Sequence, residues 1–405
     1  AGAASKLVFG VQPTNTAAGA SISPAITVQI QDANGNLVSS DTRNVTLAIG
    51  TNPGSGTLSG TATVAAVAGV ATFSTLSIDK IGTGYTLGAT SSPVLTGATS
   101  STFNITPGAA SKLVFLQQPT NTVAATSISP AITVQIQDAG GNLVSTDTRN
   151  VTLAIGTNPG GGTLSGTATV AAVSGVATFN NLSINKAGTG YTLSATSSPV
   201  LTGATSSTFN ITAGAATKLV YLQQPTNTAA GASISPAITV QIQDANSNLV
   251  TTDNTTNVTL AIGTNPGSGT LSGTATQTAV AGVATFNNLS INKTGTGYTL
   301  SATSSPVLTG ATSSTFNITP GAASKLVFIQ QPTNTVTATS ISPAITVQIQ
   351  DANSNLVSSD TRNVSLAIGT NPGGGTLSGT TTVAAVAGVA TFSTLSIDKI
   401  GTGYT

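Results

Sequence analysis

The 405-residue sequence contains no cysteine, histidine, methionine or tryptophan, and glutamate is absent too, so that all ten acidic residues are aspartates. A chain without cysteine forms no disulfide, and one without cysteine and histidine lacks the usual ligands of a zinc site. Only aspartate or lysine is left to act as a catalytic base. We therefore expect a protein that is not an enzyme and has no cofactor and no metal site.

Charge is scarce as well. Charged residues make up 5% of the chain, against about 25% in ordinary globular proteins, and the net charge is +1. Such a chain has no basic face for nucleic acid and no polybasic segment for a membrane surface, and it has no apolar run near 18 residues. We expect no nucleic-acid partner and no membrane insertion in this segment.

The dominant feature of the sequence is an internal repeat that occurs four times. The motif "SKLVF" at Ser5 returns at Ser111 and Ser324, and as "TKLVY" at Thr217, with spacings of 106, 106 and 107 residues. A period of this length is one domain, far longer than a solenoid repeat. The predicted domains are residues 5–106, 111–212, 217–319 and 324–405, and the fourth lacks its last strand.

Within each unit, short stretches alternate between apolar and polar residues. In "AITVQIQD", Ile26, Val28 and Ile30 alternate with polar side chains, and "NVTLAIG" follows the same scheme. Such alternation is typical of half-buried strands, and turn residues separate the strands every 8 to 12 positions. About seven strands in some 100 residues predict an all-β protein of tandem immunoglobulin-like antiparallel sandwiches. The short linkers predict that the sandwiches abut end to end as a rod.

Two local features refine this prediction. In "GVATFSTLSI" the spacing of apolar residues changes from two to three after Phe73, which predicts a bend near Ser74 and Thr75. Tyr85 follows a glycine-rich corner at the start of a strand, and it is either a tyrosine-corner residue or a plain core aromatic. We expect all phenylalanine and tyrosine side chains to lie on core strands.

The motifs "DANGN" after the second strand and "GVATF" before "GTGYTL" resemble those of tandem bacterial Ig-like domains, such as the stalk repeats of invasin-type and intimin-type adhesins. The resemblance covers essentially the whole chain. It implies an extracellular or cell-surface location and a role as a spacer or assembly module. The receptor-binding tip domains of those adhesins have no counterpart here.

Few residues are candidates for chemistry. Asp32 and Asp41 flank one loop, and we interpret both as surface turn residues rather than as a catalytic pair. "DANGN" also matches the opening of a calcium loop, but it lacks the later acidic ligand, so a tight hairpin turn is favoured. Lys6 and Asn104 have the strand positions of a Lys–Asn isopeptide crosslink, as do their counterparts, but alternation turns both outward. The counterpart pairs are Lys112 with Asn210 and Lys218 with Asn317.

Glycosylation is a further candidate modification. The motif Asn-x-Ser/Thr is frequent, although chance makes it common in a chain rich in serine and threonine. O-linked sugar on the threonine faces is an equal alternative. The candidate N-linked sites are Asn44, Asn104, Asn150, Asn210, Asn257, Asn317 and Asn363.

The predicted surface has little charge and repeats once per domain, so little electrostatic repulsion opposes association between copies. We expect a structural extracellular protein that self-associates into a homopolymeric filament, sheath or coat, or serves as a surface stalk. The alternative is an adhesin or carbohydrate-binding module array with a glycan ligand. The last unit stops at "GTGYT", where the other three continue, and we expect the 405 residues to be a window on a longer array.

Overall fold

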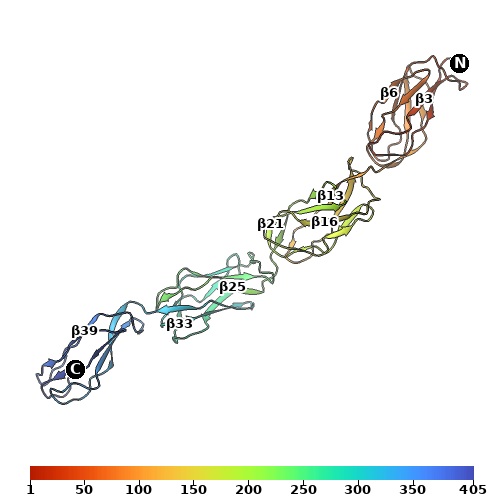
Figure 1. Ribbon diagram of the computed structural model, residues 1–405. Helices are drawn as coiled ribbons and strands as arrows, with labels where there is room; N and C mark the ends of the chain where they lie inside the picture. The colour runs from red at the N-terminus through yellow and green to blue at the C-terminus, as the bar shows by residue number, and fades with distance from the viewer. The chain divides into compact units, whose positions relative to one another are not determined.

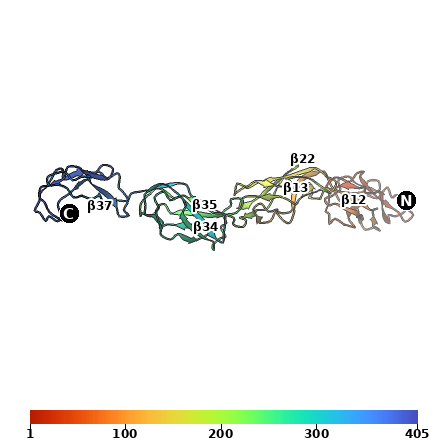
Figure 2. The same ribbon diagram turned by 90° about the horizontal axis from the view of Figure 1, so that it is seen from below.

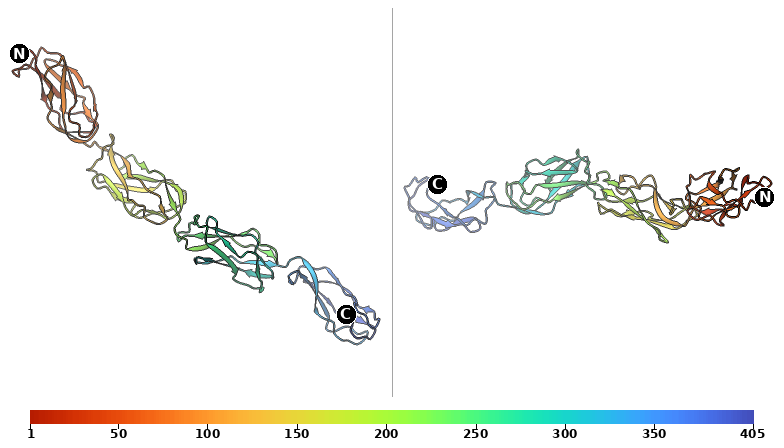
Figure 3. Two further views of the ribbon diagram at one scale, coloured as in Figure 1. Left: turned by 180° about the vertical axis from the view of Figure 1, so that it is seen from behind. Right: turned by 90° about the horizontal axis from the view of Figure 1, so that it is seen from above.

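The computed structural model describes residues 1–405, and its regular structure consists of strands. It contains no helix of the length and apolarity needed to cross a membrane. The chain divides into two compact units, Ala1–Thr212 and Ala213–Thr405, and each unit holds two of the sequence repeats. Within each unit the two repeats are separate sandwiches joined by one short segment (Figures 1 and 3).

Short strands make up each repeat. The first repeat contains β1 (Lys6–Val11), β2 (Thr16–Ala17), β3 (Ile26–Gln31), β4 (Asn44–Ile49), β5 (Leu58–Ser59), β6 (Thr63–Ala65), β7 (Val70–Phe73), β8 (Ser77–Ile78), β9 (Gly82–Tyr85), β10 (Leu87–Ser92), β11 (Ala98–Thr99) and β12 (Phe103–Thr106). The second contains β13 (Ala110–Gln117), β14 (Thr122–Val123), β15 (Ile132–Asp138), β16 (Asn150–Ile155), β17 (Leu164–Ser165), β18 (Thr169–Ala171), β19 (Val176–Phe179), β20 (Ser183–Ile184), β21 (Gly188–Tyr191), β22 (Leu193–Ser198), β23 (Ala204–Thr205) and β24 (Phe209–Thr212).

The second unit repeats the pattern. Its first repeat contains β25 (Lys218–Gln223), β26 (Thr228–Ala229), β27 (Ile238–Gln243), β28 (Asn257–Ile262), β29 (Leu271–Ser272), β30 (Thr276–Thr278), β31 (Val283–Phe286), β32 (Ser290–Ile291), β33 (Gly295–Tyr298), β34 (Leu300–Ser305), β35 (Ala311–Thr312) and β36 (Phe316–Thr319). Its second contains β37 (Ala323–Gln330), β38 (Ile345–Asp351), β39 (Asn363–Ser365), β40 (Leu377–Ser378), β41 (Thr382–Ala384), β42 (Val389–Phe392) and β43 (Ser396–Ile397).

The sheets of the first repeat form the two layers of an immunoglobulin-like sandwich. One layer is the sheet β1-β3-β7, and the other combines β11-β10-β4-β6 with β2-β12-β9. The two parts of the second layer are continuous in sequence, because Thr86 alone separates β9 from β10. The predicted alternation is confirmed: Ile26, Val28 and Ile30 on β3 are fully buried, while the residues between them are half-exposed. Each repeat is thus an Ig-like β-sandwich.

Each repeat has its own apolar core. The buried side chains form four separate clusters, one for each repeat, and the first contains Phe73 and Tyr85 in fully buried positions. The predicted bend after Phe73 is confirmed, because β7 ends at Phe73 and β8 begins only at Ser77. The tyrosine-corner hypothesis is confirmed as well, since the Tyr85 hydroxyl donates a 2.9 Å hydrogen bond to the main-chain oxygen of Lys80.

The fourth repeat is more open than the others. It has no counterpart of β2 or of β9 to β12. A cavity of about 460 Å³ lies in this repeat and is lined in part by Phe328 and Ile345. Phe328 is 43% exposed, whereas its counterpart Phe9 is 8% exposed. The prediction that every aromatic side chain lies on a core strand is therefore wrong for Phe328 and Tyr404. The strands that would cover Phe328 are absent, and Tyr404 lies on no strand and is only half-buried.

Candidate functional site: the junctions between repeats

The turn after the second long strand of each repeat is built around a buried aspartate. In the second repeat, Asp138 accepts hydrogen bonds from the main-chain and side-chain nitrogens of Asn142, at 2.8 to 3.1 Å. It also accepts a 2.9 Å hydrogen bond from the Gly108 N–H, in the linker that precedes the repeat. The carboxylate therefore ties the linker to the turn.

The same bond occurs in every repeat. A linker glycine 30 positions earlier donates its N–H to the aspartate at 2.7 to 2.9 Å, and the four pairs are Gly2 with Asp32, Gly108 with Asp138, Gly214 with Asp244, and Gly321 with Asp351. All four aspartates are at most 2% exposed. The interpretation of Asp32 as a surface residue is therefore wrong, because the linker folds over its carboxylate. The hairpin turn itself is confirmed.

The hydrogen bonds keep these carboxylates ionised. The Gly2 N–H, followed by the donors of Asn36, lowers the pKa of Asp32 from 3.8 to about 2. For Asp138, burial raises the pKa, but the hydrogen bonds from Asn142 and Gly108 outweigh it, and the net shift is downward. Hydrogen bonding to the charged form favours that form. The turn is thus built around a charged carboxylate whose oxygens accept hydrogen bonds from several N–H donors.

The Asn142 side chain also reaches across to the preceding repeat. Its Nδ2 donates to the main-chain oxygen of Asp79 at 2.9 Å, and its Oδ1 accepts from the Ile81 N–H at 3.3 Å. Beside it, Lys80 Nζ donates to the main-chain oxygen of Gly140 at 2.8 Å. One amide side chain therefore joins the turn of the second repeat to the corner loop of the first.

The junction inside the second unit has the same arrangement. Asn355 donates to the oxygen of Asn292 at 3.0 Å and accepts from the Thr294 N–H at 3.2 Å. Lys293 donates to the oxygen of Asn353 at 2.8 Å. The side chains differ between the two junctions, but each bond has a counterpart, because most partners on the corner loop are main-chain atoms. We call this Asp–Asn turn with its bonds to the preceding corner loop the junction latch.

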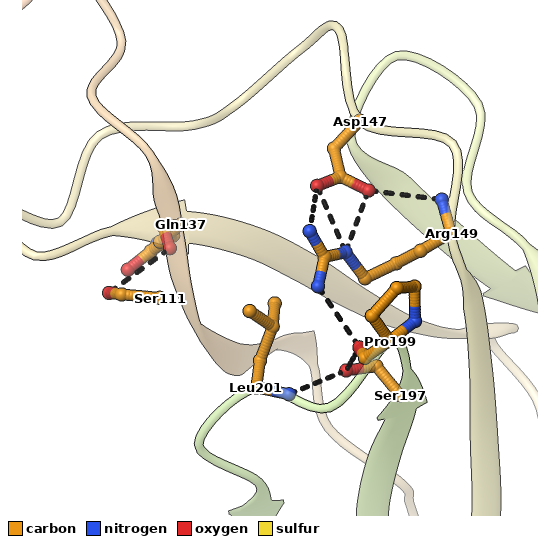
Figure 4. A network of polar contacts seen from close by, with 7 residues as sticks. All are labelled: Ser111, Gln137, Asp147, Arg149, Ser197, Pro199 and Leu201. Atoms are coloured by element: carbon orange, nitrogen blue, oxygen red, sulfur yellow. Dashed lines mark hydrogen bonds and ion pairs between the residues drawn. The ribbon is translucent and has the colours of Figure 1, made fainter.

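A second polar contact fixes the neighbouring loop. The Arg149 guanidinium forms a bidentate ion pair with Asp147, with Nη2 to Oδ2 at 2.7 Å, and donates to the main-chain oxygen of Pro199 at 3.0 Å (Figure 4). The hydrogen bonds from Arg149 lower the pKa of Asp147. The first repeat has the same contacts at Arg43. Asp41 thus pairs with Arg43, and no hydrogen bond or ion pair joins it to Asp32.

The residues considered for an isopeptide crosslink have other partners. Asn104 Oδ1 accepts a 3.0 Å hydrogen bond from the Gly84 N–H, and Asn317 accepts from Gly297 in the same way. Lys218 Nζ donates to Ser247 at 2.8 Å. Lys6 lies on β1, opposite Gln31 of β3. The structure records no contact between a lysine and an asparagine of these pairs.

The glycosylation motifs fall into two environments. Asn44, Asn150, Asn257 and Asn363 begin a strand and are exposed. Asn104, Asn210 and Asn317 lie on the last strand, are half-buried, and accept a main-chain hydrogen bond from a glycine. The exposed set is therefore the more accessible to a modifying enzyme. No group of three acidic side chains is positioned to hold a metal ion.

No protein-family model matches the chain, and no curated protein sequence matches it either. Among solved structures, the chain is similar to the Escherichia coli adhesin FdeC, with 15% identity and a TM-score of 0.33 over 79% of this chain and 98% of the other. It is also similar to invasin, a bacterial integrin-binding protein, with 11% identity and a TM-score of 0.31 over 98% and 77%. A third similar structure is the surface layer protein SbsC, domains 1-6, with 14% identity and a TM-score of 0.23 over 100% and 51%. An adhesin, an integrin-binding protein and a surface layer protein are thus among its structural neighbours.

Proposed function

We propose that this chain is a structural protein of the extracellular space or cell surface, which associates with further copies of itself into a filament, sheath or coat. The observation that carries the proposal is an exposed, uncharged, apolar hairpin tip that every repeat presents at the same position in its sequence. Val67, Val173, Val280 and Val386 occupy it and are 71 to 77% exposed. A surface that recurs once per repeat allows many weak contacts to act together.

The backbone holds each tip in place. In the first repeat, Val67 and Val70 pair across a two-residue turn. Ala68 has a φ of 48° and Gly69 a φ of 77°, and positive φ at both central residues is typical of the tight hairpin turn whose twist matches that of its strands. The tip is therefore a formed feature of the fold.

Little charge opposes contact between copies. Of the ten aspartates, the four of the Asp–Asn turns are buried, and three more are paired with arginine at 2.7 Å. Proteins that stay apart normally carry many unpaired surface charges. A second copy of the chain is therefore the partner that fits this surface best.

The test replaces the four tip valines with aspartate. We expect the unchanged chain to show a concentration-dependent increase in sedimentation coefficient, and the variant to stay monomeric over the same range. A matched control places four aspartates at exposed serines outside the hairpin, at the ends of β5, β17, β29 and β40, and should still associate. These serines are Ser59, Ser165, Ser272 and Ser378. If the chain is monomeric at all concentrations, or if both variants behave alike, the proposed association through the tips is wrong.

A further inference from the structure

The first and last segments of each of the first three repeats run side by side in the same direction. In the first repeat, Leu7 N–H donates to Thr96 O at 2.9 Å near one end of this run, and Ala18 N–H donates to Thr106 O at 2.8 Å near the other. Between them, β2 and β12 pair in parallel. Residues 5–18 and 96–106 therefore form one continuous contact, which we call the terminal clamp.

Two amide side chains extend the clamp where the main chains do not pair. Gln12 Oε1 accepts a 2.9 Å hydrogen bond from the Ser101 N–H, and Asn15 Oδ1 accepts a 2.7 Å bond from the Asn104 N–H. The main chains of β2 and β12 pair over only two residues each. The two side-chain bonds extend this pairing into a row of hydrogen bonds along both segments. Gln12 and Asn15 belong to no strand, so the alternation of apolar and polar residues does not explain why these positions hold amide side chains. Their hydrogen bonds to the last segment do explain it.

The clamp recurs with nearly the same bonds. In the second repeat Asn121 accepts from the Asn210 N–H, and in the third Asn227 accepts from the Asn317 N–H, both at 2.7 Å. The end bonds recur as well, at 2.8 to 2.9 Å. The fourth repeat lacks the last segment, and there Leu326 is 54% exposed although its counterpart Leu7 is 3% exposed. The last segment thus covers the first strand and completes the repeat.

The direction of the two segments decides how the clamp responds to tension. The chain enters a repeat at the start of the first segment and leaves it at the end of the last, and β13 begins four residues after β12 ends. Figure 2 shows β12 and β13 in neighbouring repeats. Because the segments are parallel, a pull on the two ends of the repeat acts along both and in opposite directions. All the hydrogen bonds of the row must then break together, whereas a pull across the row would break them one after another.

We propose that the terminal clamp makes each complete repeat a load-bearing element that resists tension applied along the chain. This property belongs to the single repeat and does not depend on whether copies of the chain associate. It assigns a mechanical role to Gln12, Asn15 and their counterparts. Forced unfolding is governed by the unfolding rate, so the clamp acts by raising the barrier to the first rupture.

The test holds the full chain at constant force between two handles and measures the lifetime of each repeat. The variant replaces Asn15, Asn121 and Asn227 with alanine, which removes one hydrogen bond from each clamp. Loss of a bond of ordinary strength should make forced unfolding about fivefold faster. The control replaces Asn52, Asn158 and Asn265, whose side chains bond only within their own turns, and should leave the lifetime under force unchanged.

A second measurement keeps every hydrogen bond of the clamp and changes only the direction of the applied force. Since the chain has no cysteine, pairs of cysteines can be introduced as the only attachment points. Handles at Ala1 and Ala109 load the clamp of the first repeat lengthwise, and handles at Ala20 and Ala109 pull its two segments apart from one end. We expect the first repeat to unfold at a high force in the first geometry and at a much lower force in the second. Equal forces in both, or equal lifetimes for both asparagine variants, would overturn the proposal.

Discussion

Asn142 and Asp79 lie on opposite sides of the junction in the first unit and are joined by a 2.9 Å hydrogen bond from the Asn142 side chain to the Asp79 main-chain oxygen. The same Asn142 side chain bonds to Asp138 of its own turn. A single amide therefore links the linker-binding carboxylate of one repeat to the corner loop of the repeat before it.

Replacing Asn142 with alanine should loosen the orientation of the first two repeats relative to each other. Both hydrogen bonds that its side chain forms across the junction disappear, and only the bond from Lys80 to the Gly140 oxygen remains. Spin labels at Ser59 and Ser165, two equivalent exposed positions, report this as a broader distance distribution in electron resonance. Replacement of Asn181, which bonds only to Thr167 of its own repeat, is the control and should leave the distribution unchanged. An equally narrow distribution in the Asn142 variant would show that the latch does not fix the junction.

Acid should destabilise the repeats through the buried aspartates. Asp32 has a folded-state pKa of about 2, below its ordinary value of 3.8, so its contribution to stability is complete above pH 4 and is lost as the pH falls from 4 toward 2. Thermal unfolding followed from pH 8 to pH 2 should show a constant midpoint down to about pH 4 and a fall below it.

Part of this fall should disappear in a chain in which the four turn aspartates are replaced by asparagine. That variant should be less stable at pH 7 and should show a shallower decrease below pH 4. A midpoint that does not change between pH 4 and pH 2 in the unchanged chain would contradict the role of these carboxylates.

Calcium should have no effect on stability. The Asp138 oxygens are already occupied by N–H donors of Asn142 and Gly108, and a calcium ion requires several free oxygen ligands. Calorimetric titration with calcium chloride should give no binding heat, and a chelator should not shift the thermal midpoint. A saturable binding heat that is lost in the Asp138→Asn variant would contradict this reading of the turn.

The two tyrosines of the third repeat should respond differently to loss of the hydroxyl. Tyr298 donates to the Lys293 oxygen from a fully buried position, so Tyr298→Phe should cost about 1 kcal/mol. Tyr221 donates to the Leu300 oxygen, but that oxygen also accepts from the Ser313 N–H, and the other repeats have phenylalanine at this position. Tyr221→Phe should therefore be nearly neutral. Native-state hydrogen exchange of the third repeat measures both changes, and equal effects would contradict the prediction.

The sequence predicted the strands better than it predicted the junctions. The alternation at Ile26, Val28 and Ile30 depends only on the two faces of one strand, which is a local property. The structure confirms that these three side chains are buried. The burial of Asp32 depends on a glycine 30 residues away, and the cross-junction bonds of Asn142 span 61 to 63 residues. No local pattern encodes such contacts. The signal that was present is the fixed spacing of aspartate and linker glycine in all four repeats.

The terminal clamp was missed for a similar reason. Gln12 and Asn15 lie in a segment with turn-like composition, and their partners are main-chain groups 89 residues later. A side chain that accepts from a distant main-chain N–H leaves no periodicity in the sequence. Comparison among the repeats shows that asparagine stands at this position in each of them, which is an observation that the sequence alone could have supplied.

Electron microscopy of the native material at high dilution, without added partner, tests the central claim most directly. The account predicts continuous fibres or sheets whose axial repeat is one domain or a small multiple of it, because each repeat presents the same uncharged tip to a second copy. Isolated single chains, with no lateral or end-to-end contacts, would contradict a self-associating structural role and would favour an adhesive module that acts alone.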